Sequence, residues 1–163
     1  MMNRRGLLMA LAGAACARES LAQTANDARA LVEQIYKVSA GPNGKYDGPS
    51  VLHDGKLRAR YLTKSLVAAL DAMDRKSKRA NEPILDFDPI TDSQDPSVTK
   101  LTFATESSTP TRAVVAAKFF AEGAKDATIV RYVLLMEGDA WKVDDMNGGR
   151  TREGAWNLRQ VIK

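Results

Sequence analysis

Residues 127–146 read ATIVRYVLLMEGDAWKVDDM, and this stretch decides the fold class. It holds two runs rich in β-branched, leucine and aromatic residues, one from Ala127 to Met136 and one from Ala140 to Met146. Runs of this composition favour β-strands. Between them, Glu137-Gly138-Asp139 places a glycine where a tight turn needs a positive φ. The stretch therefore predicts an antiparallel β-hairpin.

The sequence on both sides of this hairpin extends it into a larger sheet. Upstream, residues 97–106 and 111–121 have the composition and alternation of two further strands, with Leu101 and Phe103 on one face of the first. We therefore expect a curved antiparallel sheet of about four strands. Downstream, the residues from Trp156 to Ile162 predict a short closing helix.

The first half of the chain has a helical period instead. From a cap at Asn26, apolar residues recur every three or four positions until Gly41-Pro42, which predicts one amphipathic helix. The turn-rich residues 41–49 predict a loop. A short helix near residues 57–62 and a longer one from Thr63 to Arg79 follow. Helices followed by an antiparallel meander indicate an α+β domain, in which helices cover one face of the sheet.

The N-terminus carries the signature of an export signal. Arg4-Arg5 precede the uncharged apolar run 6–16, which is shorter than the roughly 20 residues that span a bilayer. Ser20-Leu21-Ala22 matches a signal-peptidase site, so we predict a signal peptide over residues 1–22, a mature domain over residues 23–163, and a periplasmic location. Sec and twin-arginine export both fit the arginine pair.

Cys16 supports an alternative processing of the same segment. Residues 11–16, Leu-Ala-Gly-Ala-Ala-Cys, are similar to a lipoprotein cleavage box, although Gly13 stands where that pattern has a branched apolar residue. Lipidation at Cys16 would make the protein a membrane-anchored lipoprotein, and the anchor would be its membrane contact. We favour cleavage after Ala22 over this alternative and over a buried N-terminal helix.

Composition excludes several classes of protein. Residues 1–22 contain three arginines and one glutamate, so their removal lowers the net charge from +4 to +2, which gives no case for nucleic-acid binding. With Cys16 as the single cysteine and His53 as the single histidine, the chain has no disulfide, Cys-His pair or multi-histidine zinc site. It also lacks nucleotide-binding and serine-hydrolase motifs, and we expect no cofactor.

Several short motifs resemble those of a known family. Residues 30–36, ALVEQIY, are followed by residues 85–89, LDFDP, by Gln94-Asp95, by the hairpin at residues 137–146 and by Trp156-Asn157-Leu158-Arg159. This order resembles the bacterial domain-of-unknown-function family 3828, over Ala28 to Ile162. The resemblance implies an exported protein or lipoprotein with a nuclear-transport-factor-2-like, or cystatin-like, fold and a pocket between helices and sheet. It implies no assigned activity, and proteins of that fold include isomerases, dehydratases and binding modules.

Asp145 is the candidate for catalysis. Asp144 and Asp145 are adjacent on a strand, so their side chains point to opposite faces. If Trp141 and Val143 face the core, Asp145 shares that face and lies at the edge of the concavity, where burial would raise the pKa of its carboxyl. Pairing with an arginine or capping of a following turn is the structural alternative. Candidate ligand-binding side chains in the same pocket are Tyr36, Tyr61 and Trp141, with core packing as their alternative role.

The acidic segment from Asp86 to Pro96 adds the candidate ligand-binding residues Asp88, Gln94 and Asp95. Carboxylates at this spacing can bind calcium, but the segment lacks the glycine and the distal glutamate of a calcium-binding loop. Because a proline follows both aspartates and extends their backbone, we favour a structural turn and assign no metal. His53 lies at the edge of a loop, where a histidine more often contacts solvent or caps a turn, so it does not distinguish between possible functions.

Two functions fit these features. The first is a non-enzymatic binding or interaction module that binds an unknown small ligand or envelope protein through the pocket, the open sheet face or residues 41–49. The second is a small-molecule enzyme of the isomerase or hydratase type that uses Asp145. The oligomeric state, monomer or homodimer, stays open.

Overall fold

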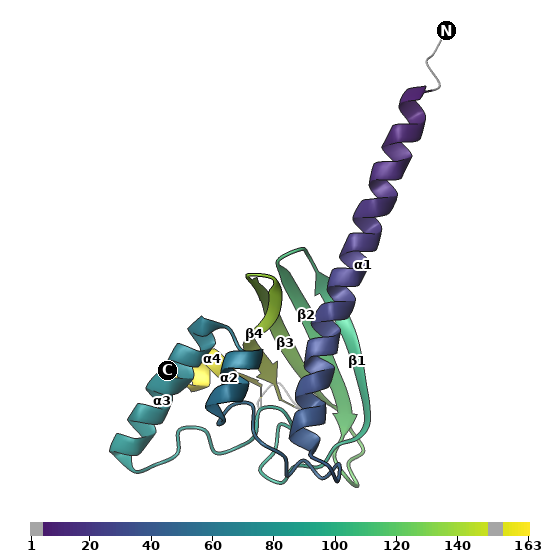
Figure 1. Cartoon of the computed structure of the whole chain (residues 1–163). Coiled ribbons are helices and arrows are strands. Elements are labelled where there is room, and N and C mark those ends of the chain that lie inside the picture. The colour runs from purple at the N-terminus through teal and green to yellow at the C-terminus, as the bar shows by residue number, and fades with distance from the viewer. Residues whose placement is uncertain (1–4, 150–154) are drawn as a thin grey trace.

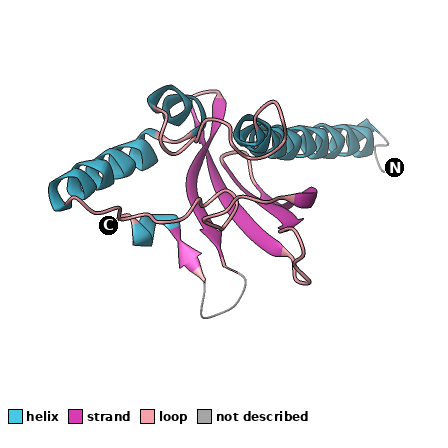
Figure 2. Cartoon of the chain, turned by 90° about the horizontal axis from the view of Figure 1, so that it is seen from below, coloured by secondary structure: helices cyan, strands magenta, loops and turns pink. Residues whose placement is uncertain are grey.

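The computed structural model describes the backbone of residues 5–149 and 155–163, and the side chains of these residues from Gln23 onward. Five antiparallel strands form one sheet in the order β1-β2-β3-β4-β5, and helices pack against it (Figures 1 and 2). The α+β class is therefore confirmed. The elements are α1 (Arg5–Ala40), α2 (Gly55–Tyr61), α3 (Lys64–Ala80), β1 (Thr99–Ser108), β2 (Arg112–Phe120), β3 (Thr128–Glu137), β4 (Ala140–Gly148), β5 (Trp156–Asn157) and α4 (Leu158–Val161).

The strands of the predicted sheet form where the alternation places them, with one addition. The β3–β4 hairpin closes at Glu137↔Ala140, and Gly138 has the expected positive φ of 61°. The prediction of about four strands was too low by one. Trp156 and Asn157 pair with Gly148 and Asn147 as β5 before α4 begins. A two-residue strand is too short to show alternation, so only the neighbouring edge of β4 identifies it.

The helices lie close to their predicted ranges, except at the start of α1 and at the start of α4, which begins at Leu158 rather than at Trp156. Asp54 caps α2 and Thr63 caps α3 with their side-chain oxygens, and α1 ends at Ala40, just before Gly41 with φ 65°. However, α1 does not begin at a cap on Asn26: it runs continuously from Arg5, so the helical turn before Asn26 already accepts its backbone hydrogen bonds. The first half of α1 projects beyond the sheet (Figure 1).

The two processing sites predicted near the N-terminus lie where the structure describes no side chains. They are the cleavage site after Ala22 and the lipidation site at Cys16. Within the described part of the chain, no helix is long and apolar enough to cross a membrane.

Aromatic side chains fill the space between α1 and the sheet. Tyr36 of α1 makes edge contacts with Phe103, Phe119 and Tyr132, at ring-centroid distances of 5.3, 6.1 and 6.1 Å. Tyr36, Phe119 and Tyr132 are almost fully buried. Such contacts contribute about 0.5–1.5 kcal/mol each beyond the burial of apolar area. The concavity where the sequence placed a pocket is thus occupied by core at this point.

A β-bulge in β4 overturns the predicted orientation of Asp145. Trp141 and Val143 are buried, as expected, but the next buried residue is Met146. The register shifts here, because Val133 lies opposite Asp145 while Leu134 lies opposite Val143, which leaves one extra residue in β4. The bulge resets the alternation by one position, so Asp145 does not share the core face.

Candidate functional site

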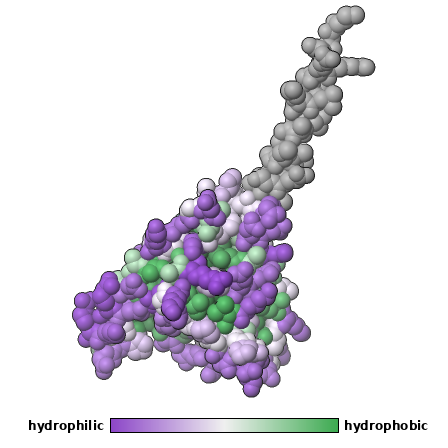
Figure 3. All heavy atoms as spheres, viewed as in Figure 1, coloured by the Kyte–Doolittle hydropathy of each residue, from purple (hydrophilic) through white to green (hydrophobic). Residues whose placement is uncertain are grey.

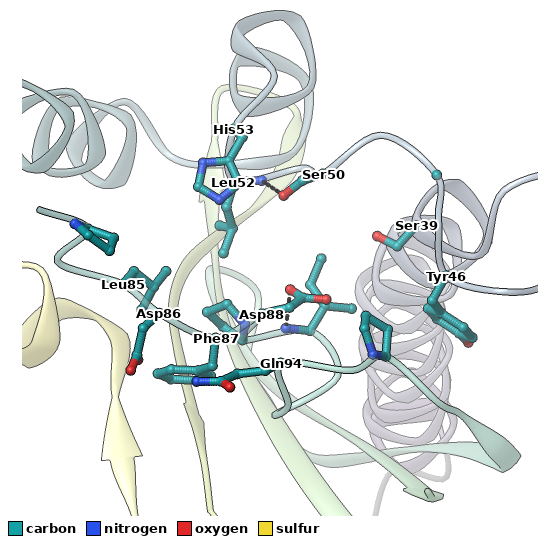
Figure 4. A pocket seen from close by; sticks show the side chains of 15 residues that line it. Ser39, Tyr46, Ser50, Leu52, His53, Leu85, Asp86, Phe87, Asp88 and Gln94 are labelled. Carbon is teal, nitrogen blue, oxygen red and sulfur yellow. Dashed lines mark hydrogen bonds between the residues drawn. The ribbon is translucent and has the colours of Figure 1, made fainter. Parts of the chain in front are cut away.

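A pocket of about 650 Å³ opens at the end of α1, between two loops. One loop covers residues 41–54 and connects α1 to α2; the other covers residues 81–98 and connects α3 to β1. We call this hollow the loop pocket (Figure 4). Its polar lining consists of Ser39, Ser50, His53, Asp86, Asp88 and Gln94, and its apolar lining includes Tyr46, Leu52, Leu85, Phe87, Ile90 and three prolines.

Ser39 places an unpaired hydroxyl in this pocket. It lies in the last turn of α1 and is only 6% exposed. Its Oγ is buried and has no hydrogen-bond partner among the described residues. Figure 4 shows this hydroxyl directed toward the middle of the pocket. Because the great majority of buried polar atoms are hydrogen-bonded, an unpaired one beside a hollow marks a place for a ligand atom.

Asp88 supplies a carboxyl from the opposite loop. Its Oδ1 accepts a hydrogen bond from the Ile90 amide at 3.0 Å, and its Oδ2 accepts one from the Thr91 hydroxyl at 3.0 Å. Burial nevertheless raises the pKa of Asp88, and these two hydrogen bonds, nearby His53 and the Thr91 backbone amide offset that effect only in part. The carboxyl points into the pocket in Figure 4. The pocket therefore holds a desolvated carboxyl, the kind of group that gains most from a positively charged or donating neighbour.

Both loops are held in place from outside the pocket. The Tyr36 hydroxyl donates to the Ile90 carbonyl at 2.7 Å, which ties the second loop to α1. The Trp156 Nε1–H donates to Asp92 Oδ1 at 2.6 Å, and the Trp156 ring contacts Phe87 edge-on at 5.2 Å. In the first loop, the buried Arg58 of α2 donates through Nε to the Leu52 carbonyl at 2.6 Å. The pocket walls are thus anchored by α1, α2 and β5.

The backbone of the first loop is strained where it meets the pocket. Tyr46 has φ 57°, in the left-handed region that a bulky non-glycine residue rarely adopts. Such conformations cost on the order of 1–3 kcal/mol and concentrate at functional sites. Its ring nonetheless stays against Tyr36, with ring centroids 6.3 Å apart. This backbone conformation places the aromatic ring of Tyr46 at the edge of the pocket.

The structure brings together some of the predicted site residues and separates the others. Asp88 and Gln94 line the loop pocket, and Tyr36 lies behind it. Asp95 is not among the lining residues, and its backbone carbonyl accepts a hydrogen bond from Ser93.

Tyr61 and Trp141 line a different hollow of about 410 Å³ between α1, α2 and the β3–β4 hairpin. Leu31 and Met136 are part of the same wall. Figure 3 shows apolar patches bordered by polar side chains over the middle of the face of the molecule that it draws. The aromatic residues that the sequence grouped with Tyr36 therefore belong to a second surface.

Asp144 and Asp145 both hold the C-terminal segment. Asp145 accepts hydrogen bonds from the Met146 and Arg159 amides and from the Asn157 side chain. Asp144 accepts from Arg159 Nη2 at 2.6 Å and from Thr63. Asp145 therefore uses both of its oxygens for structural hydrogen bonds, two of them at the start of α4, whereas the pairing with an arginine side chain that the sequence suggested for Asp145 is made by Asp144.

Sequence reasoning missed Ser39, Ser50 and Phe87 as pocket residues. The only local signal was the turn-rich loop after Ser39, which was recognised as a surface but not linked to the acidic segment. Their meeting depends on the tertiary contacts of Tyr36 and Trp156 described above. Within the described residues, no group of three or more histidine, cysteine, aspartate or glutamate side chains is arranged to hold a metal ion.

The arrangement of the loop pocket suits non-covalent recognition of a small polar molecule. It offers hydrogen-bond acceptors and a carboxyl on one side and apolar or aromatic walls on the others, which is the usual composition of ligand sites. Comparisons with known proteins found no matching family model, no matching curated protein and no matching solved structure.

Proposed function

We propose that this chain is a non-enzymatic binding module and that the loop pocket is its small-molecule site. The observation that carries the proposal is the buried Ser39 hydroxyl, which is directed toward the pocket without a described partner, while the desolvated carboxyl of Asp88 lies on the opposite wall. A buried unpaired hydroxyl costs about 1–3 kcal/mol of stability. A ligand atom that bonds with Ser39 would remove this cost, so the free protein is already arranged for it.

The dimensions and support of the pocket are consistent with this role. Its volume of about 650 Å³ falls within the range of roughly 300–1,000 Å³ that is common for small-molecule sites. Its loops are anchored by hydrogen bonds from Tyr36, Arg58 and Trp156, so little ordering is needed on binding. A pre-formed site loses less conformational entropy than one that must fold around its ligand.

A second candidate function is a small-molecule enzyme of the isomerase or hydratase type. Asp88 is a better candidate than Asp145 for the catalytic carboxyl of such an enzyme. Asp88 lies in a pocket and burial raises its pKa, as a general acid or base requires. The binding function remains our main proposal, since both Asp88 oxygens already accept hydrogen bonds from its own turn.

The export signal and the family resemblance lead to a proposed setting for this activity. We propose a periplasmic protein of the nuclear-transport-factor-2-like type, with membrane-anchored lipoprotein as the alternative. Among the side chains that the structure describes, the core begins at Ala28, and the first half of α1 projects beyond the sheet. Removal of residues 1–22 would therefore leave the described core intact.

Native mass spectrometry of the protein purified from the cell envelope tests these proposals together. We expect a bound mass that is retained by the natural protein and by Asp126→Asn, an exposed position outside the pocket, but lost in Ser39→Ala and Asp88→Asn. Equal retention in all four proteins would contradict the assignment of the pocket. The intact mass also distinguishes cleavage after Ala22 from lipidation at Cys16, and the spectrum reports monomer or homodimer.

A further inference from the structure

We propose that the loop pocket selects ligands that carry a cationic amine, with the ammonium group held between the Asp88 carboxyl and the Ser39 hydroxyl. This inference rests on the proposed binding function and adds the chemical class of the ligand. The two groups come from opposite walls, Ser39 from the last turn of α1 and Asp88 from the loop before β1, and both point into the pocket (Figure 4). Their position defines where the charged end of the ligand sits.

The charges around the pocket favour a cation. Asp86 and Asp88 are both lining residues, whereas none of the described residues that line the pocket is a lysine or an arginine. An anionic ligand would be repelled by these two carboxylates, whereas a cationic ligand would be attracted. Such complementarity of charge gives a binding site its specificity.

The hydrogen-bonding capacity of the pocket also matches an ammonium group. An ammonium has three donors and no acceptor, so it needs several oxygen atoms close together. Each Asp88 oxygen accepts only one of the hydrogen bonds described above and keeps a lone pair, and the Ser39 oxygen has both lone pairs free among the described residues. The exposed Gln94 side chain adds a third acceptor at the rim.

The remaining walls suit the carbon skeleton of such a ligand. Tyr46 and Phe87 border the pocket with aromatic rings, which attract cations by about 0.5–2 kcal/mol when within about 6 Å. Leu52 and Leu85 provide apolar surface beside them. An amine on a short alkyl or aryl skeleton therefore meets complementary surface at both of its ends.

The affinity for an amine should depend on pH, because the charge of Asp88 depends on pH and on the groups around it. The titratable groups that act on this region are His53 and Asp86 in the loops, Tyr36 of α1, Tyr132 of β3, and nearby Tyr46 and Asp92. Burial raises the pKa of Asp88, and an ammonium beside it would lower that pKa and release the proton. Affinity should thus increase as pH rises through the raised pKa of Asp88.

The test compares three probes of nearly equal shape on the full chain: n-butylammonium, n-butanol and butyrate. Backbone amide chemical shifts in two-dimensional NMR spectra report both affinity and position. We expect n-butylammonium to shift the amide signals of Ser39 and Asp88 in a saturable way, with butanol weaker and butyrate without effect. Loss of a hydrogen bond to a charged group weakens binding by about tenfold or more, which we expect for Asp88→Asn, and a smaller loss of about fivefold is expected for Ser39→Ala.

Two control variants separate the site from general effects of mutation. Ser108→Ala removes another buried hydroxyl without a described partner, at the far end of β1, and Asp126→Asn removes an exposed carboxylate outside the pocket. Both are expected to bind n-butylammonium as the natural protein does. Equal affinity of Asp88→Asn and the natural protein for n-butylammonium would overturn the proposal.

The two proposals fail in different ways. If butanol or butyrate shifts the pocket signals more strongly than n-butylammonium, the preference for amines is wrong while the binding site stands. If none of the probes shifts these signals, the preference for amines is also wrong, and the retained mass in native spectra then decides the binding function separately. If n-butylammonium shifts signals only outside the loop pocket, the placement of the amine against Asp88 is refuted.

Discussion

Replacement of Ser39 by alanine should make the protein more stable while it weakens ligand binding. Ser39 lies in the last turn of α1, it is 6% exposed, and its hydroxyl has no partner among the described residues. In the folded protein this hydroxyl has lost its hydrogen bonds to water without replacing them. Its removal therefore takes away a cost that only the folded, ligand-free state carries.

The size of the effect follows from two contributions. An unpaired buried hydroxyl costs about 1–3 kcal/mol. Alanine also has the better helix propensity, by at most about 0.5 kcal/mol and less in a final turn. Loss of this single buried oxygen atom leaves only a small cavity, whose cost reduces the gain slightly. We expect Ser39→Ala to raise the free energy of unfolding by about 1–2 kcal/mol, and Tm by roughly 2–8 °C for a domain of this size.

Thermal and urea unfolding of the ligand-free protein would measure this change. The matched control is Ser77→Ala, which makes the same substitution in the last turn of α3, where the Ser77 hydroxyl donates to the Glu82 carbonyl at 2.6 Å. Loss of that hydrogen bond offsets the gain in propensity, so Tm should change little. A Ser39→Ala variant that is no more stable than the natural protein would show that the hydroxyl has a partner, and the main support for the binding site would disappear.

Three further outcomes follow from the same structure. Gly48→Ala should lower stability by about 1–3 kcal/mol in urea unfolding, because the added Cβ would lie 2.3 Å from the Val38 carbonyl oxygen; Gly55→Ala, which meets nothing within 4 Å, should be nearly neutral, and equal effects would count against this explanation. Asp145→Ala should cost about 2–4 kcal/mol and speed hydrogen exchange in α4, since Asp145 accepts two hydrogen bonds at the start of α4 and one from the Met146 amide in β4; unchanged exchange would argue against a structural role. Burial raises the folded-state pKa of Asp88 above its ordinary 3.8, so the folded state holds the proton longer and stability is lost as pH rises through that raised pKa. Asp88→Asn should flatten this slope in unfolding series from about pH 3 to about pH 7, and an unchanged slope would refute the assignment.

Ser39→Ala is expected to increase stability and to weaken ligand binding, and this trade-off applies to other groups in the pocket as well. Unpaired and desolvated polar groups lower the stability of a ligand-free protein, and they are retained where function needs them. Two such groups, Ser39 and Asp88, face the same hollow from different loops. The strained backbone of Tyr46 at its edge is a third cost in the same place. Their coincidence is what distinguishes the loop pocket from the other hollows in the described part of the chain.

Features that depend on neighbours in the chain were predictable from the sequence. The β3–β4 turn at Gly138, the end of α1 at Gly41 and the start of α3 after Thr63 all follow from short-range preferences of backbone and side chain. These interactions span at most four residues, so the order of amino acids contains the whole signal. The exception is the start of α1, where residues before Asn26 continue the helix and make a cap unnecessary.

The composition and order of residues by themselves determined the α+β class, the main helices and four of the strands. The tertiary structure alone decided the orientation of Asp145, the fifth strand and the site, since each depends on contacts between distant segments. A single extra residue in β4 turned Asp145 away from the core, and two hydrogen bonds, from Tyr36 of α1 and Trp156 of β5, hold the acidic loop in place. No local pattern encodes such contacts, because their partners lie 54 and 64 residues apart in the chain.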